Sequence, residues 1–204
     1  MRAILVRHGE SEGNQRGIIQ GGLESQLTER GQRQSLALAA ALADFPVAQI
    51  YTSPALRAQS TASVLADKFA CPITLDERLR ERHFGLLQGL SFDEARIAYP
   101  ETMRRLAAGD PLISAPQGES VVDVSKRMLT VLNTLALSHA GETVVVVTHG
   151  AALEILLWQL KGAAPDDELS RYSQQNCSYS LLELTSAGPE LQRWGIGTHL
   201  LKVN

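Results

Sequence analysis

The chain has 204 residues, 44% of them hydrophobic and 20% charged, and its formal net charge is −3 at pH 7. This length fits one domain, residues 1–204, that can bury a large core without disulfides or metals. A weakly negative chain without a long basic stretch argues against nucleic acid, or an anionic membrane surface, as a general partner. No apolar run approaches transmembrane length, and the first one meets a charged residue too early for a signal peptide, so we expect a cytoplasmic protein.

Strands and helices alternate through most of the chain. In chain order, the apolar patterns predict a strand at 3–6, a helix at 29–43, a strand at 50–52, a helix from 53 to about 69, a short strand at 73–75, a helix from 120 to about 138, a strand at 144–147 and a helix at 151–160. Thr28 is a predicted N-cap, and Ser120 with Asp123 resembles a capping box. Ser53 and Pro54 predict a capped helix start with proline at the first helical position.

The end of the chain follows a different pattern. Residues 179–184 and 191–196 are separated by turn-forming residues at 186–189, which predicts an antiparallel pair at an edge of the sheet. The alternation before this pair is typical of an α/β domain with a parallel sheet. The edge strands could support a homodimer.

Residues 85–118 interrupt the alternation. Ser91, with Glu94 three residues later, predicts a capped helix, which is followed by Pro100, a short segment at 102–108 and a loop at 109–118. An insertion of this kind inside a compact domain is often a lid or a binding loop, although a plain surface excursion is the alternative. Its apolar residues could contact a substrate or form a small core of the insertion itself, and they are Leu86, Leu87, Phe92, Ile97, Tyr99, Leu112 and Ile113.

Two histidines follow strands of the predicted sheet. His8 comes directly after the first strand and Arg7, and His149 comes directly after the strand at 144–147 and a threonine. In open α/β sheets, ligands bind beyond the carboxyl ends of the strands. Two imidazoles at that edge, one of them beside an arginine, predict a site for an anionic substrate.

These residue types fit the transfer of a phosphoryl group. That reaction needs a nucleophile, cations around the phosphate oxygens and an acid for the leaving oxygen. His8 can be the nucleophile, because a neutral imidazole nitrogen can attack phosphorus. Arg7 can donate two hydrogen bonds to the phosphate, and Arg57 lies in the first turn of a predicted helix, whose N-terminus favours anions. His149 can donate to a phosphate oxygen.

Longer stretches of the sequence resemble the histidine phosphatase superfamily, the phosphoglycerate mutase-like proteins. The matching segments, in the family's order, are LVRHGESEGN at 5–14, LTERG at 27–31, YTSPALRA at 51–58, LRERHFG at 79–85 and VTHG at 147–150. The resemblance covers nearly the whole chain. It implies a single histidine phosphatase domain, built as a three-layer α/β/α sandwich with a mostly parallel central sheet, an antiparallel edge and a short lid insertion. It also implies a phosphohistidine intermediate and no metal or organic cofactor.

The resemblance also implies a role for each matching residue. His8 is then the nucleophile, Glu81 the proton donor, and Arg7, Arg57 and His149 form the phosphate pocket. Further substrate-binding positions are Asn14, Gln20, Gly21 and Gly150. Spacing does not separate Glu81 from the nearby Glu77, and only the match to the Glu-Arg-His-aromatic-Gly pattern selects Glu81.

The superfamily contains both mutases and phosphatases, and we favour a phosphatase of a small phosphorylated metabolite. Cofactor-dependent phosphoglycerate mutases carry a lysine where this chain has Phe92, and an arginine pair where it has Ala107 and Ala108 before Gly109. Arg104 and Arg105 lie close to the second position, so the mutase stays the alternative. The insertion is also shorter than that of the mutases, which leaves a pocket more open to water.

Two other classes of protein are weighed against this interpretation. A catalytically silent phosphate-binding protein on the same fold is the second alternative, and the intact set of catalytic residues argues against it. A metal-dependent hydrolase with both histidines as ligands is disfavoured, because two arginines would repel the cation. Cys71 and Cys177 lack metal-type spacing, and we expect reduced thiols.

Overall fold

A six-stranded sheet forms the centre of the computed structural model, which describes residues 1–108, 110, 112–162 and 169–203. The strands are β1 (Arg2–Arg7), β2 (Val47–Thr52), β3 (Ile73–Leu75), β4 (Thr143–Thr148), β5 (Tyr179–Thr185) and β6 (Gly188–Ile196). Their order is β3-β2-β4-β1-β5-β6. The first four pair in parallel, whereas β5 and β6 are antiparallel, as the sequence predicts.

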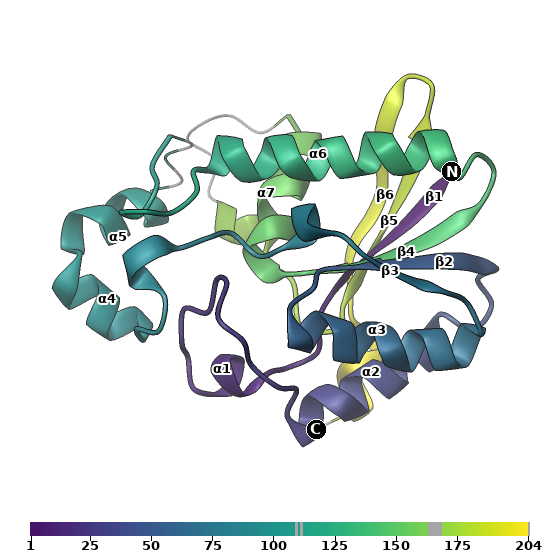
Figure 1. Ribbon diagram of the computed structural model, residues 1–204, viewed down its shortest axis with the longest axis horizontal. Coiled ribbons are helices and arrows are strands. Elements are labelled where there is room, and N and C mark those ends of the chain that lie inside the picture. Colours follow the sequence, from purple (N-terminus) through teal and green to yellow (C-terminus); the bar gives the residue numbers. More distant parts are fainter. Residues whose placement is uncertain (109, 111, 163–168, 204) are drawn as a thin grey trace.

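Helices cover both faces of this sheet (Figure 1). α2 (Glu29–Ala41) and α3 (Leu56–Phe69) lie on one face, and α6 (Val121–Ser138) and α7 (Gly150–Leu160) lie on the other. The predicted three-layer α/β/α fold is therefore confirmed. In the described part of the chain, no helix is long and apolar enough to cross a membrane.

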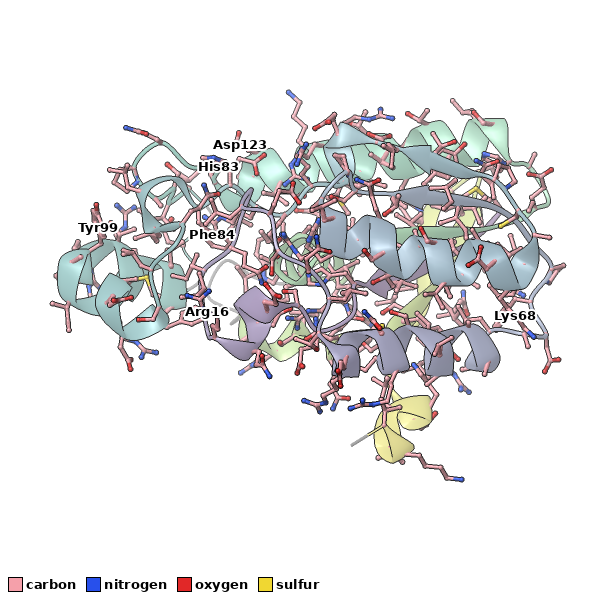
Figure 2. All side chains as sticks on the ribbon, turned by 60° about the horizontal axis from the view of Figure 1, so that its bottom comes forward. Arg16, Lys68, His83, Phe84, Tyr99 and Asp123 are labelled. Carbon is pink, nitrogen blue, oxygen red and sulfur yellow. The ribbon has the colours of Figure 1, made fainter. Side chains whose placement is uncertain are left out.

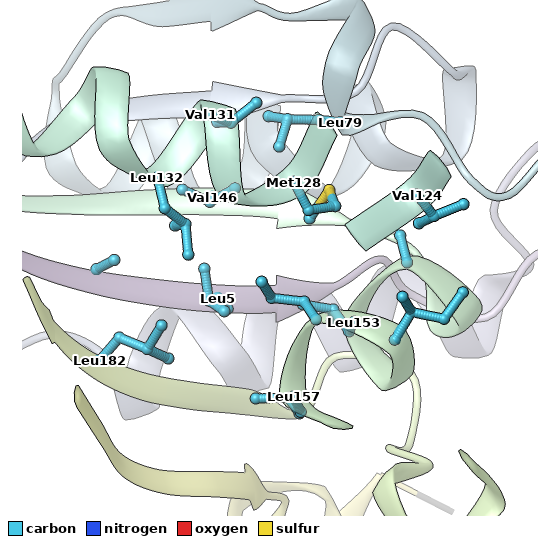
Figure 3. Packing of buried hydrophobic residues seen from close by; sticks show 14 of the residues in the cluster. Leu5, Leu79, Val124, Met128, Val131, Leu132, Val146, Leu153, Leu157 and Leu182 are labelled. Carbon is cyan, nitrogen blue, oxygen red and sulfur yellow. The ribbon is translucent and has the colours of Figure 1, made fainter. Parts of the chain in front are cut away.

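The alternation of side chains along the central strands builds two cores. Leu5 and Val146 pack against α6 and α7, where Figure 3 shows them beside Leu132 and Leu153. The intervening residues, such as Val145, face α2 and α3. Every residue of β4 is buried, because helices cover this parallel strand on both faces.

Local capping signals are confirmed for α2 and α6 but not for α3. Ser120 and Asp123 form the expected capping box. α3 begins at Leu56 with Ala55 as its N-cap and without a side-chain cap, so the predicted capped start at Ser53 and Pro54 is wrong. The Ser53 hydroxyl instead contacts His149. The Leu56 N–H at the start of α3 donates to the Glu24 carboxylate, which comes from another loop, at 2.9 Å.

The insertion forms a separate small lobe beyond the end of the sheet. It contains η2 (Gly85–Leu87), α4 (Phe92–Ala98) and α5 (Pro100–Ala107), and residues 109 and 111 of its predicted loop lie outside the described residues. The Ser91 capping box forms as predicted. Figure 2 shows Phe84 and Tyr99 on this lobe, at the end of the molecule opposite Lys68.

The lobe has its own core and also exposes apolar side chains. Its buried residues are Leu87, Ala95 and Ala115, which pack with Ile19 of the loop after α1, and Phe84, Leu90, Tyr99, Met103 and Leu106 pack against this cluster. Leu86, Ile97 and Leu112 are exposed. Of the apolar residues predicted to contact a substrate or to form a small core, Leu87 and Tyr99 belong to the small core.

Short elements without a periodic signal complete the chain. They are α1 (Glu12–Gln15) and the 3-10 helices η1 (Glu77–Leu79), η3 (Leu169–Tyr172) and η4 (Thr198–Lys202). The antiparallel bridge between Ile18 and Ser91 joins the loop after α1 to the lobe. This bridge holds the loop after α1 against the lobe.

Two leucines of α6 provide a test of the core. Leu132 is 1% exposed and Leu137 is 87% exposed. We expect Leu132→Ala to lower the free energy of unfolding by about 2–5 kcal/mol, because it removes buried methyl groups and leaves a cavity. The control Leu137→Ala, the same change on the same helix, should alter it by less than about 0.5 kcal/mol. Urea unfolding measures both, and equal losses would contradict the assigned packing.

Candidate active site

The two histidines predicted from the sequence meet at one edge of the sheet. β1 and β4 pair with Arg7 opposite Thr148, so His8 and His149 lie beyond the carboxyl ends of adjacent strands. The His8 backbone N–H donates to the Thr148 carbonyl at 3.0 Å, and the two imidazole centroids are 5.0 Å apart. His8 is 2% exposed and His149 is 0% exposed. The fold therefore places two buried imidazoles side by side.

A backbone carbonyl fixes the tautomer of His8. Its Nδ1 lies 2.7 Å from the Gly9 carbonyl oxygen, which can only accept, so Nδ1 carries the proton. Nε2 keeps its lone pair, and the Arg57 Nε donates to it at 3.3 Å. An imidazole in this form can act as a nucleophile.

Burial keeps both histidines neutral. It lowers the pKa of His8 well below the usual 6.5, and the charges of Arg57 and Arg7 lower it further, against the Gly9 hydrogen bond. Burial also lowers the pKa of His149, and His8 and the nearby arginines lower it further. The His149 Nε2 is 2.7 Å from the Ser53 hydroxyl, whereas its buried Nδ1 has no partner among the described residues.

Two arginines flank the imidazoles. Arg57, 1% exposed, donates from Nη1 to the Leu23 carbonyl at 2.7 Å and from Nη2 to the Gly21 carbonyl at 2.9 Å. Arg7 donates from Nη1 to the Gln174 carbonyl, and its buried Nε lacks a partner in the described part of the chain. Burial lowers the pKa of Arg57 against the charges of Glu81 and Glu24, and the charges of Arg80 and Arg7 add to the lowering. An anion bound between these guanidinium groups would offset their repulsion.

A cavity of about 730 Å³ opens beside these groups. The predicted residues on its wall are Arg7, His8, Asn14, Gln20, Gly21, Arg57, Glu81 and Gly150. His149 packs against the His8 ring and is fully buried. Glu77 pairs with Arg80 at the surface, so the structure brings Glu81, and not Glu77, to the cavity.

The Glu81 carboxylate caps helix α7. Its Oε1 accepts from the backbone N–H groups of Arg82 at 2.9 Å and Ala152 at 3.0 Å, and its Oε2 accepts from that of Ala151 at 3.2 Å. The first N–H groups of a helix have no partner within the helix, and the N-cap residue of α7 provides no side-chain bond. These bonds fix the carboxylate at the cavity wall.

The segment after β1 carries the predicted substrate-binding residues Asn14, Gln20 and Gly21, and residues 14–23 are called the substrate loop below. The Asn14 Oδ1 accepts from Asn176 Nδ2 at 3.2 Å and from a backbone N–H of its own turn, so the Asn14 NH₂ is left to donate. Gln20 is 9% exposed on the wall. Gly21 has a φ of +51°, which strains other residues, and a Cβ there would lie 2.0 Å from Gln88 Oε1 and force that side chain to move, so this position favours glycine.

Two residues that support the site were missed by the sequence analysis. Arg127 on α6 donates from Nη2 to the Glu81 carbonyl at 3.1 Å and so holds the segment that carries the carboxylate. Asn176 donates from Nδ2 to the His8 carbonyl at 2.9 Å. Both act on backbone carbonyls, for which no sequence pattern gives a signal.

Two further missed residues, Glu154 and Ser173, line the cavity. Glu154 lies four residues after Gly150 on α7, so both are on the same face of the helix. That spacing is a signal from which Glu154 could have been found.

The lobe supplies an apolar wall opposite the imidazoles. Its members are Phe84, Leu87, Phe92, Met103 and Leu106. Two arginines on the same wall are already paired, Arg96 with Asp93 at 2.7 Å and Arg104 with Glu101 at 2.7 Å. The cavity thus has a cationic end at the sheet, whereas its end at the lobe combines apolar side chains with two paired arginines.

No cluster of three or more His, Cys, Asp or Glu side chains suited to a metal ion occurs among the described residues. The Nε2 atoms of His8 and His149 face Arg57 and Ser53. Cys71 and Cys177 are unpaired, and burial raises the pKa of Cys177 to about 12.

Comparisons with known proteins point to one superfamily. A model of the histidine phosphatase superfamily (branch 1) matches residues 3–197. A "Probable phosphoglycerate mutase GpmB" of Cronobacter sakazakii is 34% identical over 97% of this chain and 92% of its own length. A "Metal-independent phosphoserine phosphatase" of Arabidopsis thaliana is 34% identical over 98% of this chain and 83% of its own length.

Solved structures of similar proteins share the fold. Bacillus stearothermophilus YhfR superposes with a TM-score of 0.93 at 32% identity, over 98% of each chain. The phosphoserine phosphatase of Entamoeba histolytica, solved in complex with 3-phosphoglyceric acid, has a TM-score of 0.86 at 28% identity, over 98% of this chain and 99% of its own.

The buried neutral histidines predict a pH dependence of stability. Unfolded histidines titrate near pH 6.5, so below that pH the unfolded chain binds more protons and the free energy of unfolding falls. Each histidine adds a slope of up to about 1.4 kcal/mol per pH unit. From pH 6.5 to 5.5, His149→Gln should therefore lose about 1 kcal/mol less than the wild type in phosphate-free urea unfolding.

The control for this measurement is Ser53→Ala, which removes the partner of His149 but keeps the imidazole. It should retain the steeper dependence of the wild type. Equal slopes in the wild type and His149→Gln would show that His149 is not held neutral.

Proposed function

Because the chain belongs to the histidine phosphatase superfamily, we propose that it is a phosphomonoesterase that hydrolyses a small phosphorylated metabolite through a phosphohistidine on His8. The state of His8 carries this proposal. It is a buried neutral imidazole with its proton on Nδ1 and with Arg57 beside Nε2. A lone pair held next to a cation is suited to attack a phosphorus atom whose oxygens that cation binds.

The reaction proceeds in two steps. In the first, the His8 Nε2 forms a bond to phosphorus as the bond to the ester oxygen breaks, and Glu81 gives its proton to that oxygen. In the second, a water oxygen attacks the phosphorus, Glu81 takes a proton from the water, and the bond to His8 breaks. The products are the alcohol and inorganic phosphate, and both side chains return to their starting state.

The cationic end of the cavity holds the phosphate. Arg7 and Arg57 supply positive charge to its oxygens, which is the role that a metal ion plays in other phosphatases. The buried Arg7 Nε and His149 Nδ1 have no partner in the described part of the chain, and a phosphate oxygen would satisfy such groups. The charge of these arginines supports metal-independent hydrolysis, as in the name of the Arabidopsis thaliana relative.

The walls of the cavity favour the phosphatase over the mutase. Phe92 and Ala107 line it where the sequence comparison expects mutase cations, and Arg104 is paired with Glu101. A mutase must bind a second anionic group at this end, where Arg96 and Arg104 are the cations of the wall and each already forms an ion pair with a neighbouring carboxylate. The relative of Cronobacter sakazakii carries the mutase name, which supports that alternative only weakly.

The insertion at 85–118 contributes the part of the cavity that would meet the leaving group. Its apolar residues lie on the cavity wall. Its core packs against Ile19 of the substrate loop. We propose that residues 1–204 act as one domain and that this lobe selects the alcohol part of the substrate.

His8→Ala tests the intermediate. A rapid quench with a ³²P-labelled phosphomonoester should trap acid-labile, base-stable label on the wild type and none on His8→Ala. Turnover should fall by about 10⁴-fold or more, because the nucleophile is lost.

The matched control is His139→Ala, at a histidine that bonds to Tyr51 away from the cavity. This variant should keep the label. Label that persists in His8→Ala would rule out His8 as the nucleophile. Transfer of the label to added 3-phosphoglycerate in preference to water would establish the mutase.

Glu81→Gln tests the proton donor. A general acid contributes about 10²–10⁴-fold. The single-turnover rate should fall by about that factor with an alkyl phosphate, whose alkoxide leaves poorly. With para-nitrophenyl phosphate, whose phenolate leaves unaided, the rate should fall far less.

Glu77→Gln is the control, since Glu77 lies at the surface in the same segment. It should behave like the wild type with both substrates. Equal losses with both substrates in Glu81→Gln would instead assign Glu81 to positioning or to water activation.

A further inference from the structure

One carboxyl group of the cavity has no role in the proposed reaction. Glu154 lies on α7 at the cavity wall, partly buried, and Ser173 lies on the same wall near it. Glu81 already provides the proton, and the arginines hold the phosphate. A polar group placed in a ligand cavity without a reaction step to perform is a candidate for substrate recognition.

Among the described residues, no cation forms an ion pair with the Glu154 carboxylate. No lysine or arginine of the described residues lies within 4.0 Å of it, and residues 109, 111, 163–168 and 204 include no basic side chain. The charged groups that face it are Glu81, from the segment before the lobe, and Arg7, from the end of β1.

Burial raises the pKa of Glu154 to about 7, and the charge of Glu81 also raises it, against the nearby Ser173 hydroxyl and the charge of Arg7. The carboxyl group is therefore costly to ionise while the cavity is empty. A cation beside it would remove that cost.

The position of Glu154 matches the alcohol side of a bound ester. Helical side chains lean toward the N-terminus of their helix, so Glu154 covers the turn that contains Ala151. The Glu81 carboxylate bonds to the N–H of Ala151, and the leaving oxygen must lie within hydrogen-bond reach of Glu81. Glu81 and Glu154 thus lie on the same cavity wall, within electrostatic range of each other, and the alcohol part of the ester extends from the leaving oxygen along that wall.

We propose that Glu154, with Ser173 beside it, binds a primary ammonium group on the alcohol part of the substrate, and that the substrate class is the phosphomonoesters of amino alcohols. This proposal rests on the phosphatase function proposed above. An ammonium group supplies the charge that Glu154 lacks and three donors, one of which the carboxylate accepts. A second carboxylate on the substrate would be repelled at this position, and a neutral hydroxyl would leave the charge uncompensated.

Two achiral substrates test the contribution of the ammonium group alone. O-phosphoethanolamine and 2-hydroxyethyl phosphate differ only in an ammonium against a hydroxyl group. At pH 8 the wild type should show a kcat/KM at least about tenfold higher for the amine. Glu154→Gln, which keeps the size of the side chain, should lower kcat/KM for the amine by about 10–100-fold and for the hydroxyl ester by less than about twofold.

The pH dependence of this preference provides a second measurement. The ratio of the two kcat/KM values cancels the titration of the catalytic groups and, closely, that of the substrate phosphate. It should rise from pH 6 to pH 8 in the wild type, because Glu154 loses its proton near pH 7. In Glu154→Gln it should be flat.

Two further variants control for structural effects. Glu154→Asp retains the charge and should keep part of the preference for the amine. Glu190→Gln changes an exposed carboxylate on β6, away from the cavity, and should match the wild type.

The outcomes distinguish this proposal from the phosphatase function. Hydrolysis of para-nitrophenyl phosphate without a preference for the amine overturns the role of Glu154 alone. Equal losses on both esters in Glu154→Gln also overturn it. A wild type that hydrolyses none of the three compounds overturns the phosphatase function and this proposal together.

Discussion

The parallel pairing of β1 with β4 is the constraint on which the site depends. With Arg7 opposite Thr148, both strands end at the same level, and His8 and His149 follow side by side. A slip of one residue would turn the side chains of a strand to the opposite face of the sheet. All four valines of β4 are buried, two in the core on each face, so the hydrophobic pattern of this strand alone does not set its register. The backbone pairing of Arg7 with Thr148, and the bond from the His8 N–H to the Thr148 carbonyl, hold the two imidazole centroids 5.0 Å apart.

Arg57 connects this edge to the rest of the cavity. Its guanidinium is buried, which costs free energy unless its N–H groups are bonded, and its bonds go to His8, Gly21 and Leu23. One side chain thereby joins α3, the substrate loop and the nucleophile. The charges of Glu81 and Glu24 offset part of its positive charge, and an anion bound between Arg57 and Arg7 would offset more. The same contacts that order the empty site thus give it affinity for phosphate.

The predictions from the sequence succeeded where the signal is local. The β-branched strands, and the capping boxes at Ser91 and Ser120, depend on neighbouring residues and appear in the structure. The predicted start of α3 failed because Ser53 contacts His149, which is distant in sequence. Arg127 and Asn176 act through carbonyl groups of other segments, which leave no trace in residue spacing. Glu81 was separated from Glu77 by family resemblance, since both lie in one charged segment.

Helix α7 unites the steps of the proposed reaction. Its first N–H groups hold Glu81, and a Cβ at Gly150 would lie 3.3 Å from the Arg7 Cζ, so the helix closely approaches the phosphate-binding arginine. One turn later it carries Glu154. Because Leu153 and other apolar residues bury this helix against the sheet, these groups keep fixed relative positions. The lobe at 85–118 packs in a separate core, so its apolar wall can change without moving them. In the proposed enzyme, α7 therefore recognises the charge of the alcohol, and the lobe recognises its bulk.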